Sequence, residues 1–212
     1  AWGGTEENRF RLLRDVIWEV RKILPAHMPL LVKLNAHDYT PEEGITPLLA
    51  TAYARRLAGL AIDALEVSCG TSTLSPWQMC RGDVPVLEIL QNIPESKRSR
   101  AAESLERIRD KFKMEEGYNL GKAIVMRTET GRLPLIAVGG WRHVKAMEAA
   151  VEQGQIDLVS LCRPFIREPS LVKKFRMGKT KTASCVNCNR CLMALANHLP
   201  VRCYHKGLPV PR

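Results

Sequence analysis

The sequence lacks any apolar run long enough to span a membrane, and it opens without a secretory signal pattern. We therefore expect a cytoplasmic protein with no membrane partner. Aromatic residues make up only 6% of the chain, and the densest basic run, residues 97–100, contains none, although grooves that stack nucleic-acid bases need such rings. The formal charge of +10 therefore favours anionic partners in general, and we predict no nucleic-acid partner.

The sequence also lacks a Gly-x-Gly-x-x-Gly motif after any apolar run, which disfavours a dinucleotide-binding Rossmann unit. It does not begin with Met, so we expect a fragment or a processed product. The 212 residues, 45% of them apolar, suffice for one domain with a hydrophobic core.

Apolar spacing and capping residues predict alternating helices and strands. We expect helices over residues 5–24, 46–59, 97–114, 143–153 and 170–178, with a turn or two of helix within 118–129. Strands are expected at 29–36, 62–70, 134–140 and 156–161, whereas residues 71–94 show no clear pattern. Continuous apolar strands separated by helices are typical of a covered parallel sheet. We therefore predict an α/β fold of the TIM (β/α)8-barrel type, whose chemistry lies at the carboxyl ends of the strands.

Two neighbouring strand ends carry groups suited to an anion. Gly139 and Gly140 follow the third strand and allow backbone N–H groups to approach a ligand closely. Arg163 follows the fourth strand with a permanent charge and a fork of donors, and Pro164 opens a helical turn. Because such barrels bind phosphate beside their last two strands, we predict a phosphate site here. The alternative is that the glycines form only a tight turn and Arg163 only a surface ion pair.

Lys33 lies inside the first apolar strand. Since burial of an unpaired charge is costly, we expect this side chain to point into the barrel mouth or to be paired. Three roles remain open at this stage. The ammonium can stabilise a reduced flavin ring, it can extend from the strand into solvent, or it can form the Schiff base of an aldolase or isomerase.

The seven cysteines are unevenly distributed. Four gather near the end of the chain, a clustering typical of a metal or cluster site rather than of a disulfide framework: Cys185, Cys188, Cys191 and Cys203. Four thiolates suit either zinc or a [4Fe–4S] cluster, so the ligand set alone does not choose between them or exclude a vestige without metal.

Several segments, in order, resemble the old yellow enzyme-like NADH:flavin oxidoreductases. They are WGGTEENRFRLLRDVIWEVR (2–21), the two strand units over 32–71, and residues 134–171, where Cys162-Arg163-Pro164 stands in place of Gly-Arg-Pro. The segment CVNCNRC (185–191) is similar to the cysteine segment of the branch that contains 2,4-dienoyl-CoA reductase and trimethylamine dehydrogenase.

This resemblance implies an FMN-dependent oxidoreductase that takes hydride from NADH or NADPH and passes it to an electron-poor small molecule, such as an enone or an enoyl thioester. It places Lys33 near flavin N1 and O2. It assigns the FMN phosphate to Gly139, Gly140, Cys162 and Arg163, with Cys162 acting through its N–H. It assigns a [4Fe–4S] cluster to Cys185, Cys188, Cys191 and Cys203.

The same resemblance starts the chain just past the fourth barrel strand. We therefore expect residues 1–178 to form strands five to eight of a flavin-binding barrel and residues 179–212 to form a Cys-rich segment. The family's acceptor-binding and proton-donating residues would precede Ala1, so no catalytic residue is assigned, and His37 and Tyr39 are interpreted as ordinary loop residues. A half barrel exposes two sheet edges, which predicts self-association or a complementary half-barrel. A non-catalytic barrel fragment is the remaining alternative.

Overall fold

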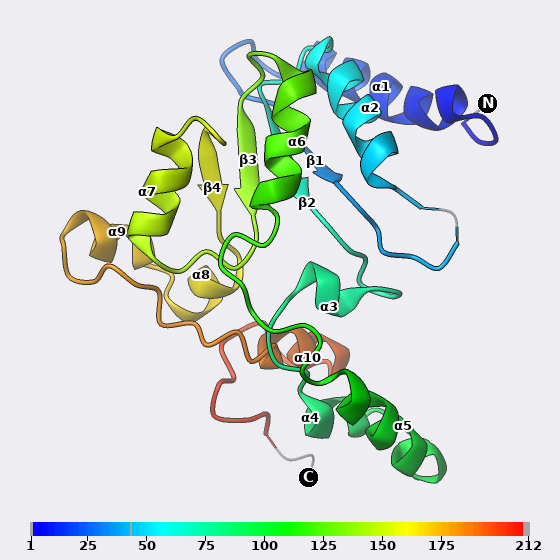
Figure 1. Ribbon diagram of the computed structural model, residues 1–212, viewed down its shortest axis with the longest axis vertical. Coiled ribbons are helices and arrows are strands. Elements are labelled where there is room, and N and C mark those ends of the chain that lie inside the picture. Colours follow the sequence, from blue (N-terminus) through cyan, green and yellow to red (C-terminus); the bar gives the residue numbers. More distant parts are fainter. Residues whose placement is uncertain (1, 43, 210–212) are drawn as a thin grey trace. The chain divides into compact units, whose positions relative to one another are not determined.

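The computed structural model describes residues 2–42 and 44–209. Its strands are β1 (Leu31–Asn35), β2 (Ala64–Ser68), β3 (Leu135–Val138) and β4 (Leu158–Ser160). They form one sheet in the order β1-β2-β3-β4, and each neighbouring pair is parallel (Figure 1). The predicted α/β class with a parallel sheet is confirmed.

Helices fill most of the remaining chain. They are α1 (Glu6–Ile23), α2 (Pro47–Ala58), α3 (Pro76–Met79), α4 (Val86–Leu90), α5 (Glu95–Ile108), α6 (Leu120–Thr130), α7 (Val144–Glu152), α8 (Arg163–Arg167), α9 (Leu171–Arg176) and α10 (Arg190–Ala196). The side chains of Thr5 and Thr46 cap α1 and α2 by accepting the N–H groups of Asn8 and Leu49.

The structure departs from the sequence-based helices in three places. α5 ends six residues before Met114, because the segment after it bonds elsewhere: the carbonyl of Phe112 accepts the N–H of Gly82, and that of Lys113 accepts Nε of Arg81. α6 is a full helix rather than a turn or two. The short helices α3, α4 and α10 were not predicted, since four to seven residues are too few to establish a helical period.

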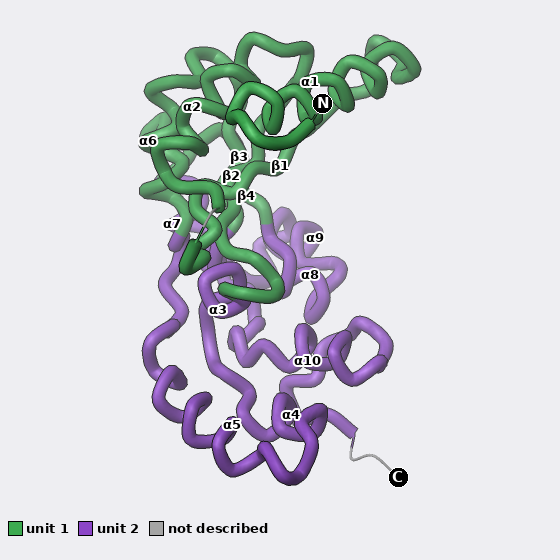
Figure 2. Tube along the Cα trace, turned by 90° about the vertical axis from the view of Figure 1, so that its right-hand side faces the viewer, with its two compact units in different colours: residues 1–75, 119–138, 150–160 green, residues 76–118, 139–149, 161–212 purple. Residues whose placement is uncertain are grey.

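The chain divides into two compact, interleaved units, coloured separately in Figure 2. Unit 1 comprises residues 1–75, 119–138 and 150–160 and holds the sheet with α1, α2 and α6. Helices α2 and α6 pack against each other and contact β1 and β3 respectively. The strands bury their core side chains Val32, Leu34, Leu65 and Val67. Burial of this kind drives the folding of unit 1.

The alternate side chains of β1 are exposed. Leu31 is half exposed, and Lys33 lies beyond it on the same side of the strand. At the opposite edge of the sheet, Leu158 of β4 is also half exposed. Within the sheet, β1 and β4 each pair with a single neighbour. Unit 1 therefore presents two open strand edges, with an apolar residue on each.

Unit 2 comprises residues 76–118, 139–149 and 161–212. It holds α3, α4, α5, α8, α9 and α10 with the first part of α7. Residues 181–183 run beside the start of α7, where His143 and Thr182 form an isolated antiparallel bridge. The sequence-based division into residues 1–178 and 179–212 was placed from motifs, whereas the two units are defined by contacts. That division stays a prediction. Over residues 2–42 and 44–209, no helix combines the length and the apolar character that a membrane crossing requires.

Candidate functional site

The glycine turn after β3 and the arginine turn after β4 start side by side. Val138, the last residue of β3, pairs in register with Ser160, the last residue of β4. Gly139 and Gly140 follow with φ angles of 146° and 71°. A Cβ on Gly140 would lie 2.4 Å from the carbonyl oxygen of Glu115. Only glycine fits this position, because both the backbone angle and the close approach exclude a side chain.

The backbone of these turns offers free hydrogen-bond donors. Within the described part of the chain, the N–H groups of Gly139, Gly140, Cys162 and Arg163 donate to no other residue. The carbonyl of Cys162 already accepts the N–H groups of Phe165 and Ile166, so α8 begins at this turn. Unpaired backbone N–H groups are strong donors that seek an acceptor. The two turns therefore present a set of donors suited to an anion.

Glu116 holds the turn that follows the glycines. One carboxylate oxygen accepts the N–H groups of both Arg142 and His143 at 2.6 Å, and the other lies 2.6 Å from Nδ1 of His143. Partial burial would raise the pKa of Glu116, but the hydrogen bonds from His143 and Arg142 outweigh it and lower the pKa. No sequence motif marked Glu116. It caps the start of α7, so the glycine N–H groups, rather than those of Arg142 and His143, remain available to a ligand.

The side chain of Arg163 turns toward the cysteine segment. It is 9% exposed, and its terminal nitrogen donates to Oδ1 of Asn189 at 2.6 Å and to the carbonyl of Arg81 at 2.9 Å. Within the described residues, no carboxylate pairs with this guanidinium. The contribution of the Arg163 side chain to a phosphate stays a prediction, whereas its buried charge lies against the loop that carries the cysteines.

The structure brings the four predicted cysteines to one place. They line a single small cavity of about 20 Å³ together with Arg163, Arg167, Asn187 and Asn189: Cys185, Cys188, Cys191 and Cys203. Asn187 and Asn189 have left-handed φ angles of 54° and 56°, which asparagine tolerates better than most residues. Nδ2 of Asn189 donates to the carbonyls of Cys80 and Asp83, which anchors the loop. The sequence did not single out either asparagine.

Burial makes two of these thiols weaker acids. It raises the pKa of Cys191 to about 11, against the opposing positive charge of Arg163, and it also raises the pKa of Cys185. A bound metal must displace their protons. Over residues 2–42 and 44–209, no three His, Cys, Asp or Glu side chains converge closely enough to share one metal ion. The cysteines thus surround the cavity without meeting at one point, and a group larger than a water requires their side chains to turn outward.

Lys33 is paired. Its Nζ lies 2.6 Å from Oε1 of Glu66, its partner in the register of β1 and β2, and its side chain is 56% exposed. The sequence predicted that this charge would either point into the barrel mouth or be paired, and the structure pairs it with a carboxylate. Its placement near flavin N1 and O2 stays a prediction.

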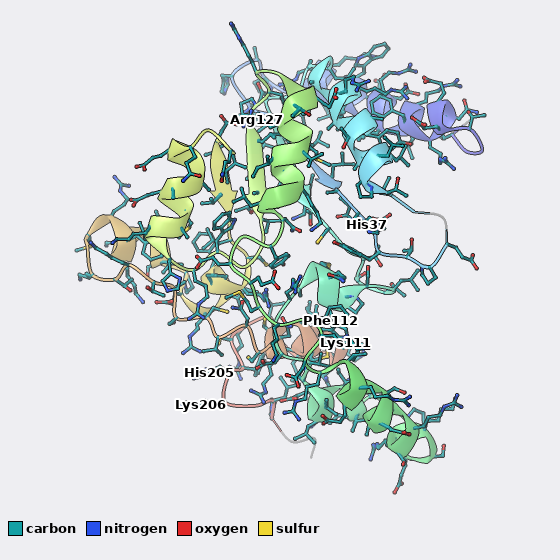
Figure 3. The ribbon with its side chains drawn as sticks, viewed as in Figure 1. His37, Lys111, Phe112, Arg127, His205 and Lys206 are labelled. Carbon is teal, nitrogen blue, oxygen red and sulfur yellow. The ribbon has the colours of Figure 1, made fainter. Side chains whose placement is uncertain are left out.

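His37 and Tyr39, which follow β1, contact each other. Nδ1 of His37 accepts the N–H of Tyr39 at 2.8 Å, and the two rings lie 4.0 Å apart. Tyr39 has a left-handed φ of 55°, unusual for an aromatic residue. Figure 3 labels His37 among the side chains of this region. The hydrogen bond and the ring contact together fix the two side chains relative to each other.

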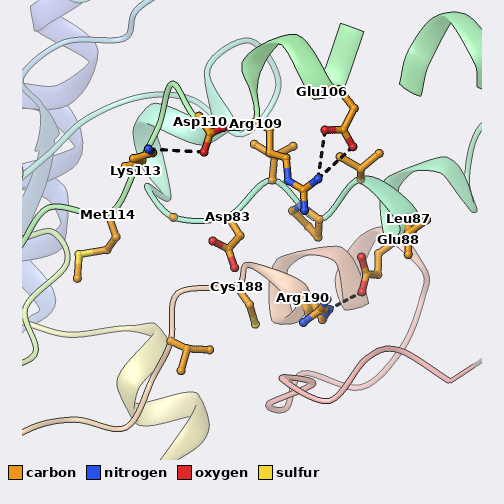
Figure 4. Close-up of a pocket in the computed structure, with 15 residues that line it drawn as sticks. Asp83, Leu87, Glu88, Glu106, Arg109, Asp110, Lys113, Met114, Cys188 and Arg190 are labelled. Atoms are coloured by element: carbon orange, nitrogen blue, oxygen red, sulfur yellow. Dashed lines mark hydrogen bonds and ion pairs between the residues drawn. The ribbon is translucent and has the colours of Figure 1, made fainter. Parts of the chain in front are cut away.

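A larger cavity of about 660 Å³ lies between α5, α4 and the start of α10 (Figure 4). Its charged side chains largely pair with one another: Arg109 with Glu106, Lys113 with Asp110, and Arg190 with Glu88. Cys188 lines this cavity as well as the small one. The mutual pairing leaves few charged groups to recognise a ligand here.

Comparison with known proteins identifies relatives of this chain. Residues 84–182 match the family model of the NADH:flavin oxidoreductase / NADH oxidase family. A 4,4'-dithiodibutanoate disulfide reductase from Rhodococcus erythropolis is 29% identical over 192 residues, which cover 90% of this chain and 47% of that protein. An NADH-dependent flavin oxidoreductase from Talaromyces variabilis is 30% identical over 174 residues, covering 82% of this chain and 36% of that protein.

The fold is similar to that of larger solved proteins. The structure of 6-hydroxypseudooxynicotine amine oxidase from Pseudomonas geniculata N1 superposes with a TM-score of 0.72 at 20% identity, covering 95% of this chain and 25% of the other. At this identity the likeness concerns the fold alone. The chain spans less than half the length of these two curated relatives.

Proposed function

Because this chain belongs to the NADH:flavin oxidoreductase / NADH oxidase family, we propose that it is the FMN-phosphate-binding part of a flavin oxidoreductase. In the complete enzyme, NADH or NADPH would reduce the flavin, which would pass hydride to an electron-poor small molecule such as an enone or an enoyl thioester. One observation carries the cofactor assignment: four unpaired backbone N–H groups at adjacent strand ends.

The residues present fit a phosphate monoester. The absence of a Cβ on Gly140 lets this turn pack closely on the carbonyl of Glu115, which holds the neighbouring backbone N–H groups in place. The N–H groups of Cys162 and Arg163 open the adjoining turn, where the substitution of cysteine for glycine leaves the donor intact. FMN would supply hydride transfer, while these residues bind and orient its phosphate.

FMN binding tests this assignment directly. Titration of the purified chain with FMN should quench the flavin fluorescence, and inorganic phosphate should compete. Riboflavin, which lacks the phosphate, serves as the control and should bind much more weakly. Equal affinity for riboflavin and FMN would remove the phosphate turns from the site.

We further propose that Cys185, Cys188, Cys191 and Cys203 hold a [4Fe–4S] cluster. Each thiolate of such a cluster binds a different iron, so the four sulfurs surround a volume instead of converging on one ion. The cysteines line one cavity without converging, which suits a cluster better than a single zinc ion with all four sulfurs at about 2.3 Å. Iron and acid-labile sulfide analysis after anaerobic reconstitution tests this. One zinc per chain without sulfide would overturn it.

The four strands are proposed to be strands five to eight of an eight-stranded barrel. The open edges at β1 and β4, with half-exposed Leu31 and Leu158, support a missing set of partners. Either a second copy or a complementary half-barrel would cover them. Multi-angle light scattering coupled to size-exclusion chromatography measures the assembly, and a cooperatively unfolding monomer would contradict the proposal.

An aldolase or isomerase is disfavoured by the surroundings of Lys33. A Schiff-base lysine is desolvated or placed next to another cation, whereas Lys33 is 56% exposed and paired with a carboxylate. Borohydride in the presence of a carbonyl substrate should therefore trap no adduct on Lys33.

A further inference from the structure

The side chain of Asn187 is buried with an unused donor. Only 3% of the residue is exposed, and Nδ2 has no hydrogen-bond partner among the described residues. Two other buried nitrogens share this property, but both belong to guanidinium groups whose other nitrogens are bonded: Nε of Arg127 and Nε of Arg142. Since buried polar groups are nearly always satisfied, Nδ2 of Asn187 requires a partner that the described residues do not supply.

The position of Asn187 is fixed by its surroundings. Its carbonyl accepts the N–H of Asp83 at 3.0 Å, and a Cβ on Gly82 would lie 2.1 Å from the same oxygen, so the segment between α3 and α4 packs tightly on this backbone. The thiol of Cys185 donates to Oδ1 of Asn187 at 3.8 Å, a contact that ends when Cys185 loses its proton to become an iron ligand. The backbone contacts therefore hold Asn187 in the wall of the small cavity, beside the cysteines.

The same cavity is lined by cations and by no carboxylate. Besides the cysteines, its wall includes Arg163 and Arg167 but no Asp or Glu. Arg167 donates to Oγ of Ser184 and lies 3.5 Å from the sulfur of Cys203. A buried cation without an anionic partner is unfavourable. The wall therefore suits an occupant that is negatively charged and accepts hydrogen bonds, as a thiolate-ligated iron–sulfur cluster does.

We propose that Nδ2 of Asn187 donates a hydrogen bond to a sulfur of the cluster, and that this bond, beside the charge of Arg163, raises the reduction potential of the cluster. The inference rests on the proposed [4Fe–4S] site. A donor to sulfur favours the reduced state because reduction adds negative charge to the cluster, and such hydrogen bonds are among the features that set cluster potentials. Asn187 is thus a positioning residue and not an iron ligand.

Asn187→Gly provides the test, because glycine accepts the left-handed backbone and removes the side chain that carries the amide. Asn187→Asp keeps the shape but replaces the donor with a carboxylate, whose negative charge should lower the potential further than Asn187→Gly does. The matched control is His198→Gly, since His198 is exposed and has the same left-handed φ of 54°. Each full chain is reconstituted anaerobically and titrated potentiometrically, with the reduced cluster followed by electron paramagnetic resonance.

Both Asn187 variants should keep the iron and sulfide of the unaltered chain and have a lower midpoint potential. We expect about a tenfold shift of the reduction equilibrium, which is about 59 mV for a one-electron couple. His198→Gly should leave the potential unchanged. Loaded variants with unaltered potentials would overturn the inference and indicate that Nδ2 binds only a buried water. An unaltered chain that takes up no iron and sulfide would instead overturn the cluster proposal itself.

Discussion

The guanidinium of Arg163 donates to Oδ1 of Asn189 at 2.6 Å. This bond joins the turn predicted to bind phosphate to the segment before α10 that carries Cys185 and Cys188. The backbone N–H of the same arginine has no acceptor in the described chain. The two predicted sites of unit 2 therefore share one residue, and a change at Arg163 is expected to affect both.

Replacing Arg163 with Ala should destabilise unit 2 and weaken FMN retention. The variant leaves Oδ1 of Asn189 and the carbonyl of Arg81 without this donor, and an unsatisfied buried group costs about 1–3 kcal/mol. Urea unfolding and fluorescence titration with FMN measure the two effects. Arg142→Ala is the control, since the side chain of Arg142 makes only a 3.5 Å contact with the carbonyl of Ala183. Equal FMN retention by both variants would remove Arg163 from the site.

Replacing Gly140 with Ala should disrupt the glycine turn. The new Cβ would lie 2.4 Å from the backbone oxygen of Glu115, at a φ of 71° that alanine disfavours. We expect a loss of about 2 kcal/mol or more in stability and a loss of FMN affinity. Gly121→Ala adds the same methyl group inside α6, where nothing lies within 4 Å, and should stabilise the chain slightly. A harmless Gly140→Ala variant would contradict the described turn.

Replacing Glu116 with Ala should loosen the start of α7. Two backbone N–H groups and the His143 ring lose their acceptor, and loss of a cap costs about 0.5–2 kcal/mol. Amide hydrogen exchange should show faster exchange at Arg142 and His143, while α1 keeps its protection. Glu115→Ala is the comparison, because the Glu115 side chain is largely exposed and pairs only with Arg81. Unchanged exchange at both amides would refute the capping role.

Glu168 should make stability depend on pH in the acid range. The hydrogen bond from Lys174 and that from the N–H of Ser184 lower the pKa of Glu168 from 4.5 to about 2. Because the folded pKa lies below the unfolded value, this stabilisation is fully present above about pH 4.5 and is lost as the pH falls toward 2.

Urea unfolding of the unaltered chain and of Glu168→Gln checks this dependence. The difference between them should be at most about 3 kcal/mol at pH 7, since one pKa unit corresponds to about 1.4 kcal/mol, and should shrink toward pH 2. Glu19→Gln is the control, because Glu19 and its partner Lys22 are both largely exposed and such pairs contribute little. A difference that stays constant from pH 7 to pH 2.5 would contradict the lowered pKa.

The strands and most long helices could be predicted from the sequence. Leu65 and Val67 stand in a mostly apolar segment typical of a buried parallel strand, and Thr5 and Thr46 cap helices where the sequence placed them. The four cysteines were also identifiable, since three of them lie within seven residues of the sequence, 185–191, and are brought close together by their spacing alone.

What the sequence alone determined was local: apolar runs, capping residues, the glycine pair and the cysteine spacing act over a few neighbouring residues. Only the tertiary structure decided the partners of polar side chains across long separations, such as Glu116 with His143 and Arg163 with Asn189. It also decided that Nδ2 of Asn187 has no partner among the described residues. The physical reason is that a hydrogen bond depends on distances of about 3 Å, which are fixed only when segments distant in the chain pack against one another.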